Sequence, residues 1–204
     1  MGDERQSFRM VMDYKLVLAS NSPRRKELLS GLGVPFEVRV LKDIDEQYPD
    51  SLPVNEVARY IAQEKAAAYR RIIADDELII TADTVVIVGD EILGKPVDEA
   101  DAVRMLQLIS GRTHQVTTGV CLLTAAQERC FDVTTDVTFK TLSDEEIHYY
   151  VERYRPFDKA GAYGIQEWIG YIGVTGLHGS YYNVMGLPVQ RIYQELTNHY
   201  QFKI

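Results

Sequence analysis

A short segment near the start of the chain concentrates residues that could bind an anion. In LASNSPRRKELLSGLG, residues 18–33, Ser22 can cap a helix whose first turn then contains Arg24 and Arg25. Cations are unfavourable beside the free N–H groups and positive dipole of a helix start unless an anion binds there. The pattern indicates an anion site, and surface arginines paired with Glu27 or a distant acid are the alternative.

Two further charged side chains interrupt apolar patterns. Lys65 falls on the helical stripe that Ile61 and Ile72 mark as buried, and a lysine there either extends to the surface or meets an anion. Asp83 interrupts LIITADTVVIV, residues 78–88, where an unpartnered carboxylate is costly and often has a functional role. The structural alternative for Asp83 is a strand-end carboxylate that accepts backbone N–H groups.

The segment GDEILGK, residues 89–95, has the glycine and lysine spacing of a phosphate-binding P-loop but fails its other requirements. Pro96 stands where the magnesium-binding hydroxyl belongs, and the segment does not open a helix. We therefore predict no P-loop, and Lys95 remains a cation presented by a loop. The four histidines lack metal-ligand spacing, and no GxSxG or HExxH motif is present.

These residues form a set suited to a polyphosphate carried with a divalent metal. Carboxylates bind a hard cation through oxygen, cations spread the phosphate charge, and one carboxylate can activate water. The cations are Arg24, Arg25, Lys65 and Lys95, and the acids are Asp45, Glu46 and Asp83.

Helices and strands that alternate along the chain must position these groups, which predicts an α/β class with a mixed sheet. Apolar runs and turn residues predict strands at 15–19, 78–88, 113–124 and 130–142. Caps and periodicity predict helices at 23–30, 54–73, from Asp98 to Ser110, after the Ser143–Glu146 capping box, and after Pro188.

The overall composition limits the class of protein. With 204 residues, 46% of them hydrophobic, and a formal net charge of −8, the chain is one large domain or two intimate lobes and does not suit coating nucleic acid or an anionic membrane. Cys121 and Cys130 are too few for a disulfide scaffold and are predicted to be buried, reduced thiols. Without a signal peptide or apolar span, we expect a soluble cytoplasmic protein with no membrane partner.

Seven motifs follow one another from about Leu16 nearly to the C-terminus. They are LASNSPRRKELL, QEKA at 63–66, TADTVV at 81–86, GKP at 94–96, SGRTHQV at 110–116, DKAGAYGIQ at 158–166 and GSYYNVMGLP at 179–188. On these motifs the chain resembles the Maf family, or septum formation inhibitor proteins, which are nucleoside triphosphate pyrophosphatases related in fold to inosine triphosphatases. The first dozen residues match nothing, so we expect a flexible extension at 1–13 and a single Maf-like domain at 14–204.

The resemblance implies an elongated mixed sheet flanked by helices, in two lobes with a central nucleotide cleft. Family members cleave between the α and β phosphates with Mg²⁺ or Mn²⁺, giving a monophosphate and pyrophosphate. By resemblance, Asp83 is the proton acceptor and also a metal ligand. A second metal ligand is expected at Asp45 or Glu46, which the resemblance does not distinguish. The positions that match the phosphate-binding residues are Ser20, Arg25, Lys65 and Lys95.

The TADT and GIQ motifs resemble the family branch that prefers dTTP and UTP over the branch that acts on 7-methyl-GTP. In that branch Arg24, Thr84 and Gln166 match positions linked to base selection. A Gln amide offers both a donor and an acceptor, which suits the alternating edge that uracil and thymine share. Glu167 follows Gln166 where a glycine is usual, so we expect the rim of the pocket to differ in shape and charge.

Two other functions are compatible with the sequence. One is a nucleotide-binding regulator of cell division whose hydrolysis is incidental. The other is single-stranded nucleic-acid binding through basic groups and C-terminal aromatics, but these aromatics are not interleaved with Lys or Arg, so we predict that they pack and that nucleic acid is not a partner. The aromatics are Trp168, Tyr171, Tyr181 and Tyr182. The sequence leaves the oligomeric state open, with a homodimer as one option.

Overall fold

A computed structural model describes residues 12–203, so the predicted N-terminal extension lies almost entirely outside the described residues. The strands are β1 (Lys15–Leu18), β2 (Phe36–Val38), β3 (Glu77–Val88), β4 (Glu91–Leu93), β5 (Thr113–Leu123), β6 (Glu128–Phe139) and β7 (Val174–His178). The helices are α1 (Pro23–Ser30), α2 (Val57–Tyr69), α3 (Glu99–Ile109), α4 (Asp144–Tyr154), α5 (Trp168–Gly173), α6 (Tyr181–Met185) and α7 (Val189–His199), with 3-10 turns η1 (Val54–Glu56) and η2 (Ala160–Ala162).

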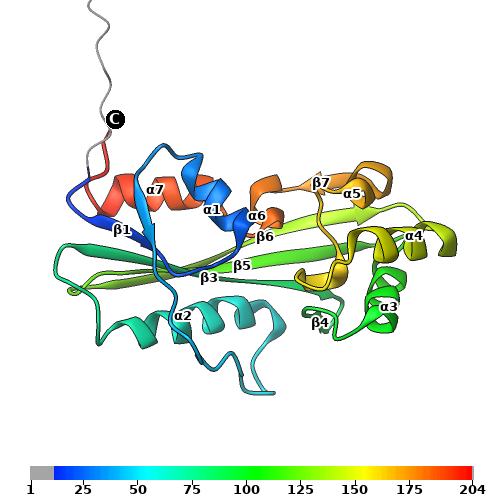
Figure 1. The fold of residues 1–204 in the computed structure, drawn as a ribbon, viewed down its shortest axis with the longest axis horizontal. Coiled ribbons are helices and arrows are strands. Elements are labelled where there is room, and N and C mark those ends of the chain that lie inside the picture. Colours follow the sequence, from blue (N-terminus) through cyan, green and yellow to red (C-terminus); the bar gives the residue numbers. More distant parts are fainter. Residues whose placement is uncertain (1–11, 204) are drawn as a thin grey trace, which may run out of the picture.

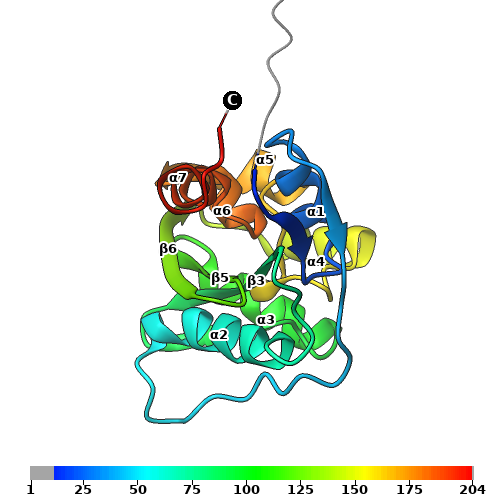
Figure 2. The same cartoon turned by 90° about the vertical axis from the view of Figure 1, so that its left-hand side faces the viewer.

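The strands form one seven-stranded mixed sheet in the order β2-β1-β3-β5-β6-β7, with β4 paired to β3 (Figure 1). β1 is parallel to β2 and β3, and the remaining pairs are antiparallel. Helix α2 covers one face, and α1 and α7 pack on the other, as Figure 2 also shows. The predicted α/β class with a mixed sheet flanked by helices is confirmed.

The long strands β3, β5 and β6 contribute to the two larger hydrophobic cores of the described residues. At one end of the sheet they pack with α1 and α7, through residues such as Leu29 and Ile192. At the other end they pack with α3 and α4, through residues such as Leu106 and Val151. Because the same three strands pass from one core to the other, the two ends of the molecule are joined by continuous backbone.

The sheet has a gap along one edge of β3. On this edge β1 pairs with β3 only as far as Ile80, and β4 pairs only from Val86 onward. Within residues 12–203, the stretch 81–85 therefore has a strand neighbour only on the β5 side. Successive side chains of a strand point to opposite faces, so Asp83 and Thr84 border this gap from different sides.

Most local predictions agree with the observed elements, and one helix is shorter than expected. Ser22 caps α1, and Pro23 is its first residue. The helix predicted for 54–73 divides into η1 and α2, which ends at Tyr69. Ile72 lies beyond that end and is 46% exposed, so its assignment to the buried stripe is wrong because the helical period has already stopped. No helix among the described residues has the length and apolar character needed to cross a bilayer.

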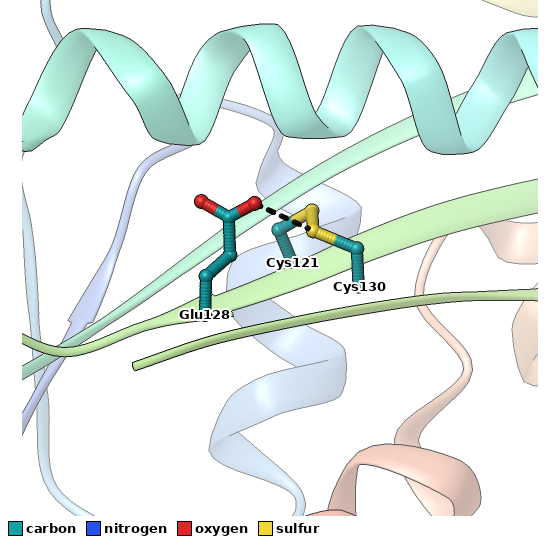
Figure 3. A group of neighbouring side chains, drawn as sticks. All are labelled: Cys121, Glu128 and Cys130. Carbon is teal, nitrogen blue, oxygen red and sulfur yellow. Dashed lines mark hydrogen bonds between the residues drawn. A yellow bond between two sulfur atoms is a disulfide. The ribbon is translucent and has the colours of Figure 1, made fainter. Parts of the chain in front are cut away.

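The prediction that both cysteines are reduced thiols is wrong. Cys121 and Cys130 form a disulfide between β5 and β6, and Figure 3 shows Glu128 beside it. The two residues face each other directly in the strand register, with Cα atoms 4.1 Å apart. The number of cysteines could not reveal this pairing, because it depends on the register of the β5–β6 hairpin. Glu128 Oε1 lies 3.5 Å from Cys130 Sγ, but sulfurs joined in a disulfide do not act as thiolate metal ligands.

The prediction that the C-terminal aromatics pack is correct for one residue and wrong for three. Trp168 packs against Tyr149, with ring centroids 4.8 Å apart. Tyr171, Tyr181 and Tyr182 are instead exposed. They belong to α5 and α6, which have only six and five residues and bury one side each. Residue type alone did not distinguish the buried side from the exposed one.

Helix α2 lies very close to the sheet at Gly119. A Cβ atom added there would lie 2.3 Å from backbone atoms of Ala58 and Arg59 in α2. Gly119 is the direct partner of Asp83 in the β3–β5 register. The missing side chain therefore allows α2 to approach the sheet beside Asp83.

We predict that Gly119→Ala lowers the free energy of unfolding by about 3 kcal/mol or more, because the new methyl group meets backbone that cannot yield. Urea unfolding followed by circular dichroism measures this. Gly176→Ala on β7 is the matched control, since its added Cβ would meet Thr138 at an ordinary 3.7 Å. Equal losses in the two variants would show that the close approach at Gly119 is not tight.

Candidate active site

A cavity of about 690 Å³ opens at the gap in the sheet. Its walls come from the start of α1, the segment before α2, α2 itself, the middle of β3 and the loop after β4, together with residues near 160 and 185. The predicted site residues that line it are Ser20, Arg24, Arg25, Glu46, Lys65, Asp83, Thr84, Lys95 and Gln166. The structure thus brings together side chains that are far apart in the sequence.

Lys65 lies between two carboxylates in this cavity. Its Nζ atom is 2.9 Å from Asp83 Oδ1 and 3.0 Å from Glu46 Oε1. The side chains of Lys65 and Asp83 are only 14% and 15% exposed. Of the two alternatives for Lys65, contact with anionic groups is the one observed. Asp83 lies inside the twelve-residue strand β3, so the alternative of a strand-end carboxylate is wrong.

The two acids that the sequence did not distinguish have different surroundings. Both are exposed, but Glu46 lines the cavity, whereas Asp45 Oδ1 accepts a hydrogen bond from the Gln47 backbone N–H at 3.0 Å. Asp45 is absent from the cavity lining. Glu46 and Asp83 converge on one cation and offer carboxylate oxygens, the ligand type that Mg²⁺ and Mn²⁺ prefer. This pair of donors fits a divalent metal.

Arg25 connects three parts of the cavity wall. Its Nε donates to Gly186 O at 2.9 Å, Nη1 to Ala82 O at 3.0 Å and Nη2 to Thr84 Oγ1 at 3.1 Å. Thr84 Oγ1 also lies 2.9 Å from Thr118 Oγ1. Burial lowers the pKa of Arg25, although a guanidinium stays protonated in a protein. Arg25 and Thr84 are therefore held firmly, and the acceptors of Arg25 are all neutral.

Arg24, the neighbouring cation, pairs with a distant acid. Its Nη1 lies 3.0 Å from Asp158 Oδ2, and Lys159 Nζ lies 2.9 Å from Asp158 Oδ1. Partial burial would raise the pKa of Asp158, but hydrogen bonds from Lys159 and Arg24 lower it to about 2. The alternative that the sequence left open, an arginine paired with a distant acid, is thus the observed state of Arg24.

Gln166 brings an unsatisfied amide to the cavity. Its Oε1 atom is buried and has no hydrogen-bond partner in the structure. A buried carbonyl oxygen without a partner is costly, and a ligand N–H would satisfy it. Glu167 does not line the cavity, because its carboxylate is directed to Lys159 and Tyr150. The expectation that Glu167 changes the shape and charge of the pocket rim is therefore wrong.

Comparison with known proteins identifies the family of this chain. Residues 15–199 match the family model described as Maf-like protein. The chain belongs to the Maf family. A relative from Phocaeicola vulgatus, named dTTP/UTP pyrophosphatase, is 63% identical over 183 residues and covers 90% of this chain and 95% of its own length. A relative of the same name from Flavobacterium psychrophilum is 50% identical over 185 residues, covering 91% and 94%.

A solved structure supports the same fold. The Staphylococcus aureus Ham1 protein matches with a TM-score of 0.50 and 15% identity, covering 90% of this chain and 100% of its own. At this identity the likeness concerns the fold alone. The Maf chain described here therefore shares the arrangement of sheet and flanking helices with that Ham1 protein.

Some residues at this Maf site carried only a weak signal in the sequence. Asp158 and Lys159 begin the DKAGAYGIQ motif, but nothing in their spacing singled them out as partners of Arg24. Tyr150 gave no signal, because tyrosines occur at both buried and partly exposed positions of helices. Only the packing of α4 against the loop at 164–167 reveals its hydroxyl as a polar contact of the site.

A buried histidine supports one wall of the cavity. His114 is 2% exposed, and its Nε2 lies 2.7 Å from the hydroxyl of Tyr163, which lines the cavity. Burial lowers the pKa of His114 from 6.5 to about 4. The histidine is therefore neutral in the folded protein at neutral pH, while the unfolded chain takes up a proton below about pH 6.5.

The folded protein should consequently lose stability as the pH falls from 6.5 toward 4, because only the unfolded state binds the proton there. Between pH 7 and 4.5 this group contributes about 2 kcal/mol of that loss. Urea unfolding at several pH values tests it, with His114→Gln as the variant that retains a polar partner for Tyr163 but does not titrate. The same pH slope in both proteins would contradict the assignment.

Proposed function

We propose that the chain is a nucleoside triphosphate pyrophosphatase that hydrolyses dTTP and UTP to the monophosphate and pyrophosphate. The observation that carries this proposal is the placement of Lys65 between Asp83 and Glu46, in a cavity that the start of α1 borders. The names of the curated relatives, which match over nine-tenths of the chain, support the same activity.

The cavity supplies a hydroxyl and cations for a triphosphate from several elements. Ser20 precedes α1, Lys65 lies on α2, and Lys95 follows β4, so the phosphates would be contacted from different sides. The N–H groups at the start of α1 add positive partial charge. Arg25 contributes a charge that no contacting carboxylate neutralises, since its bonds go to carbonyl and hydroxyl oxygens.

Glu46 and Asp83 would hold the divalent metal. When bound, Mg²⁺ or Mn²⁺ would neutralise phosphate charge and polarise the reacting phosphoryl group. Asp45 has no part in this assignment, because its carboxylate closes an exposed turn. Lys65 keeps the two carboxylates close together and limits their mutual repulsion before the substrate arrives.

Asp83 is the base that receives the proton of the attacking water. Lys65 engages its Oδ1 atom, and Oδ2 is the acceptor we assign to the water. In-line attack on the α-phosphorus breaks the bond to the bridging oxygen, and the charge of the leaving pyrophosphate falls near Lys65, Lys95 and Arg25. These fixed charges favour the transition state over the ground state because the charge develops where they already lie.

Gln166 is the group we assign to base recognition. Its unpartnered Oε1 would accept the N3–H of uracil or thymine, and its amide N–H would donate to a carbonyl of the same base. Cytosine has no hydrogen on N3, so it would leave Oε1 unsatisfied. Discrimination against cytosine then follows from an unpaired buried acceptor, a strong source of specificity.

We further propose that residues 14–204 form a single domain of two lobes and act on free nucleotides in the cytoplasm. The support for one domain is that β3, β5 and β6 enter both hydrophobic cores. A boundary between independent units would have to cut three continuous strands.

Asp83→Asn should reduce kcat for UTP by about 100-fold or more, because the amide cannot take the proton from water. A nucleotide panel with Mg²⁺, analysed for monophosphate plus pyrophosphate against diphosphate plus phosphate, measures both the rate and the bond that is cleaved. Asp90→Asn, in the exposed turn after β3, is the matched control. Orthophosphate as the primary product, or a preference for 7-methyl-GTP, would overturn the proposed function.

Glu46→Gln should raise the Mg²⁺ concentration needed for half-maximal activity by about an order of magnitude, because it removes one charged ligand. Asp45→Asn should leave that concentration unchanged. Metal titrations at saturating UTP compare the two neighbouring acids directly. A larger effect of Asp45→Asn than of Glu46→Gln would reverse the assignment of the metal ligand.

A further inference from the structure

The hydroxyl of Tyr150 holds both ends of the segment that carries Gln166. It accepts a hydrogen bond from the Gly164 backbone N–H at 3.0 Å and donates to Glu167 Oε2 at 2.5 Å. Tyr150 belongs to α4 and is fully buried. The Glu167 N–H also donates to Gly164 O at 3.0 Å, which closes a turn around Ile165 and Gln166. A buried tyrosine therefore fixes this turn from outside the cavity.

Glu167 continues the network toward α1. Its Oε1 lies 3.0 Å from Lys159 Nζ, which also contacts Asp158, and Asp158 contacts Arg24. The Lys159 side chain is only 10% exposed, so water screens its contact with Glu167 weakly. A continuous series of polar contacts thus runs from Tyr150 on α4 to Arg24 on α1.

The backbone around this network is adapted to it at two glycines. A Cβ on Gly164 would lie 3.0 to 3.2 Å from Lys159 side-chain carbons and from Glu167 Cδ, so the missing side chain makes room for the ion pair. A Cβ on Gly170 would lie 1.8 Å from Ile165 O, so α5 packs directly against the turn. The turn is therefore confined both by the polar network and by the following helix.

The network lies along the cavity wall, which Asp158 and Lys159 also line. Arg24 is its last member on the α1 side, and Gln166 is carried by the turn that Tyr150 and Glu167 hold. Gln166 Oε1 has no partner of its own, so its position depends on the turn that carries it. We infer that Tyr150 and Glu167 are positioning residues for base selection, which act by fixing Gln166 and, through Lys159 and Asp158, Arg24. This inference rests on the proposed function, because it assigns the base contact to Gln166.

Glu167 uses both of its carboxylate oxygens in this network. One oxygen accepts a hydrogen bond from the Tyr150 hydroxyl, and the other forms an ion pair with Lys159. A glycine there could make neither contact.

The test compares Tyr150→Phe and Glu167→Gln with the wild-type chain. Tyr150→Phe removes only the hydroxyl, and Glu167→Gln keeps an acceptor for Tyr150 but loses the charge that faces Lys159. We expect KM for UTP to rise about tenfold and the ratio of kcat/KM for UTP over CTP to fall about tenfold, with kcat within about twofold. Tyr154→Phe is the matched control, because its ring stacks on Tyr150 at 5.1 Å from the same helix.

The single tryptophan provides a readout that does not depend on turnover. Trp168 directly follows Glu167, so its acrylamide quenching reports whether the turn is held. Quenching should increase in Tyr150→Phe and Glu167→Gln and stay at the wild-type level in Tyr154→Phe. Unchanged quenching in both network variants would overturn the inference.

Gln166→Ala separates failure of the inference from failure of the proposed function. If Gln166→Ala loses the preference for UTP while Tyr150→Phe and Glu167→Gln keep it, the base contact stands and the network inference is overturned. If Gln166→Ala keeps the preference, the base contact is wrong and the inference fails with it. An equal loss of kcat for every nucleotide in the network variants would indicate a purely structural role and would also overturn it.

Discussion

The site depends on an interruption of the sheet. β3 is one continuous strand, but on one edge its neighbours β1 and β4 leave the stretch 81–85 without a partner among the described residues. This gap lets side chains from both faces of one strand border the same cavity, so Asp83 meets α2 while Thr84 meets Arg25. A complete sheet would have placed these residues on opposite sides of a solid layer.

Two of the cations at the gap are paired with acids before any ligand binds. Lys65 forms ion pairs with two carboxylates, and Arg24 forms an ion pair with Asp158. Arg25 differs, since its partners are neutral oxygens. The pairing of Lys65 and Arg24 with acids avoids isolated charges on these two side chains, yet an incoming metal and triphosphate could exchange partners with the same groups. The cost of preparing the site is thereby kept low.

The sequence predicted which residues belong to this site better than it predicted the contacts between them. Caps, periodicity and apolar runs located most elements, because those signals are local, and Lys65 and Asp83 stood out since each breaks a local rule. The sequence did not reveal the cross-strand disulfide, the placement of Glu46 rather than Asp45 in the cavity wall, or the contacts of the Tyr150 hydroxyl. These depend on strand register, on the path of an exposed loop and on helix packing, which are set by contacts between residues far apart in the chain. The overestimated length of α2 has a different cause, since apolar residues that continue past Tyr69 mimic a helical stripe.

The gap also has a consequence for how the protein avoids other chains. An open strand edge offers free N–H and C=O groups and usually invites pairing with a strand from another molecule, which is a route to aggregation. Here the open stretch is short, recessed in a cavity, and bounded by Ser20 on one side and Lys95 on the other. Arg25 already occupies the carbonyl of Ala82, and the charged Asp83 sits at the centre of the stretch. The opening thus has room for a small anionic molecule. An extended polypeptide would instead meet the charge of Asp83 and a carbonyl that already accepts a hydrogen bond from Arg25.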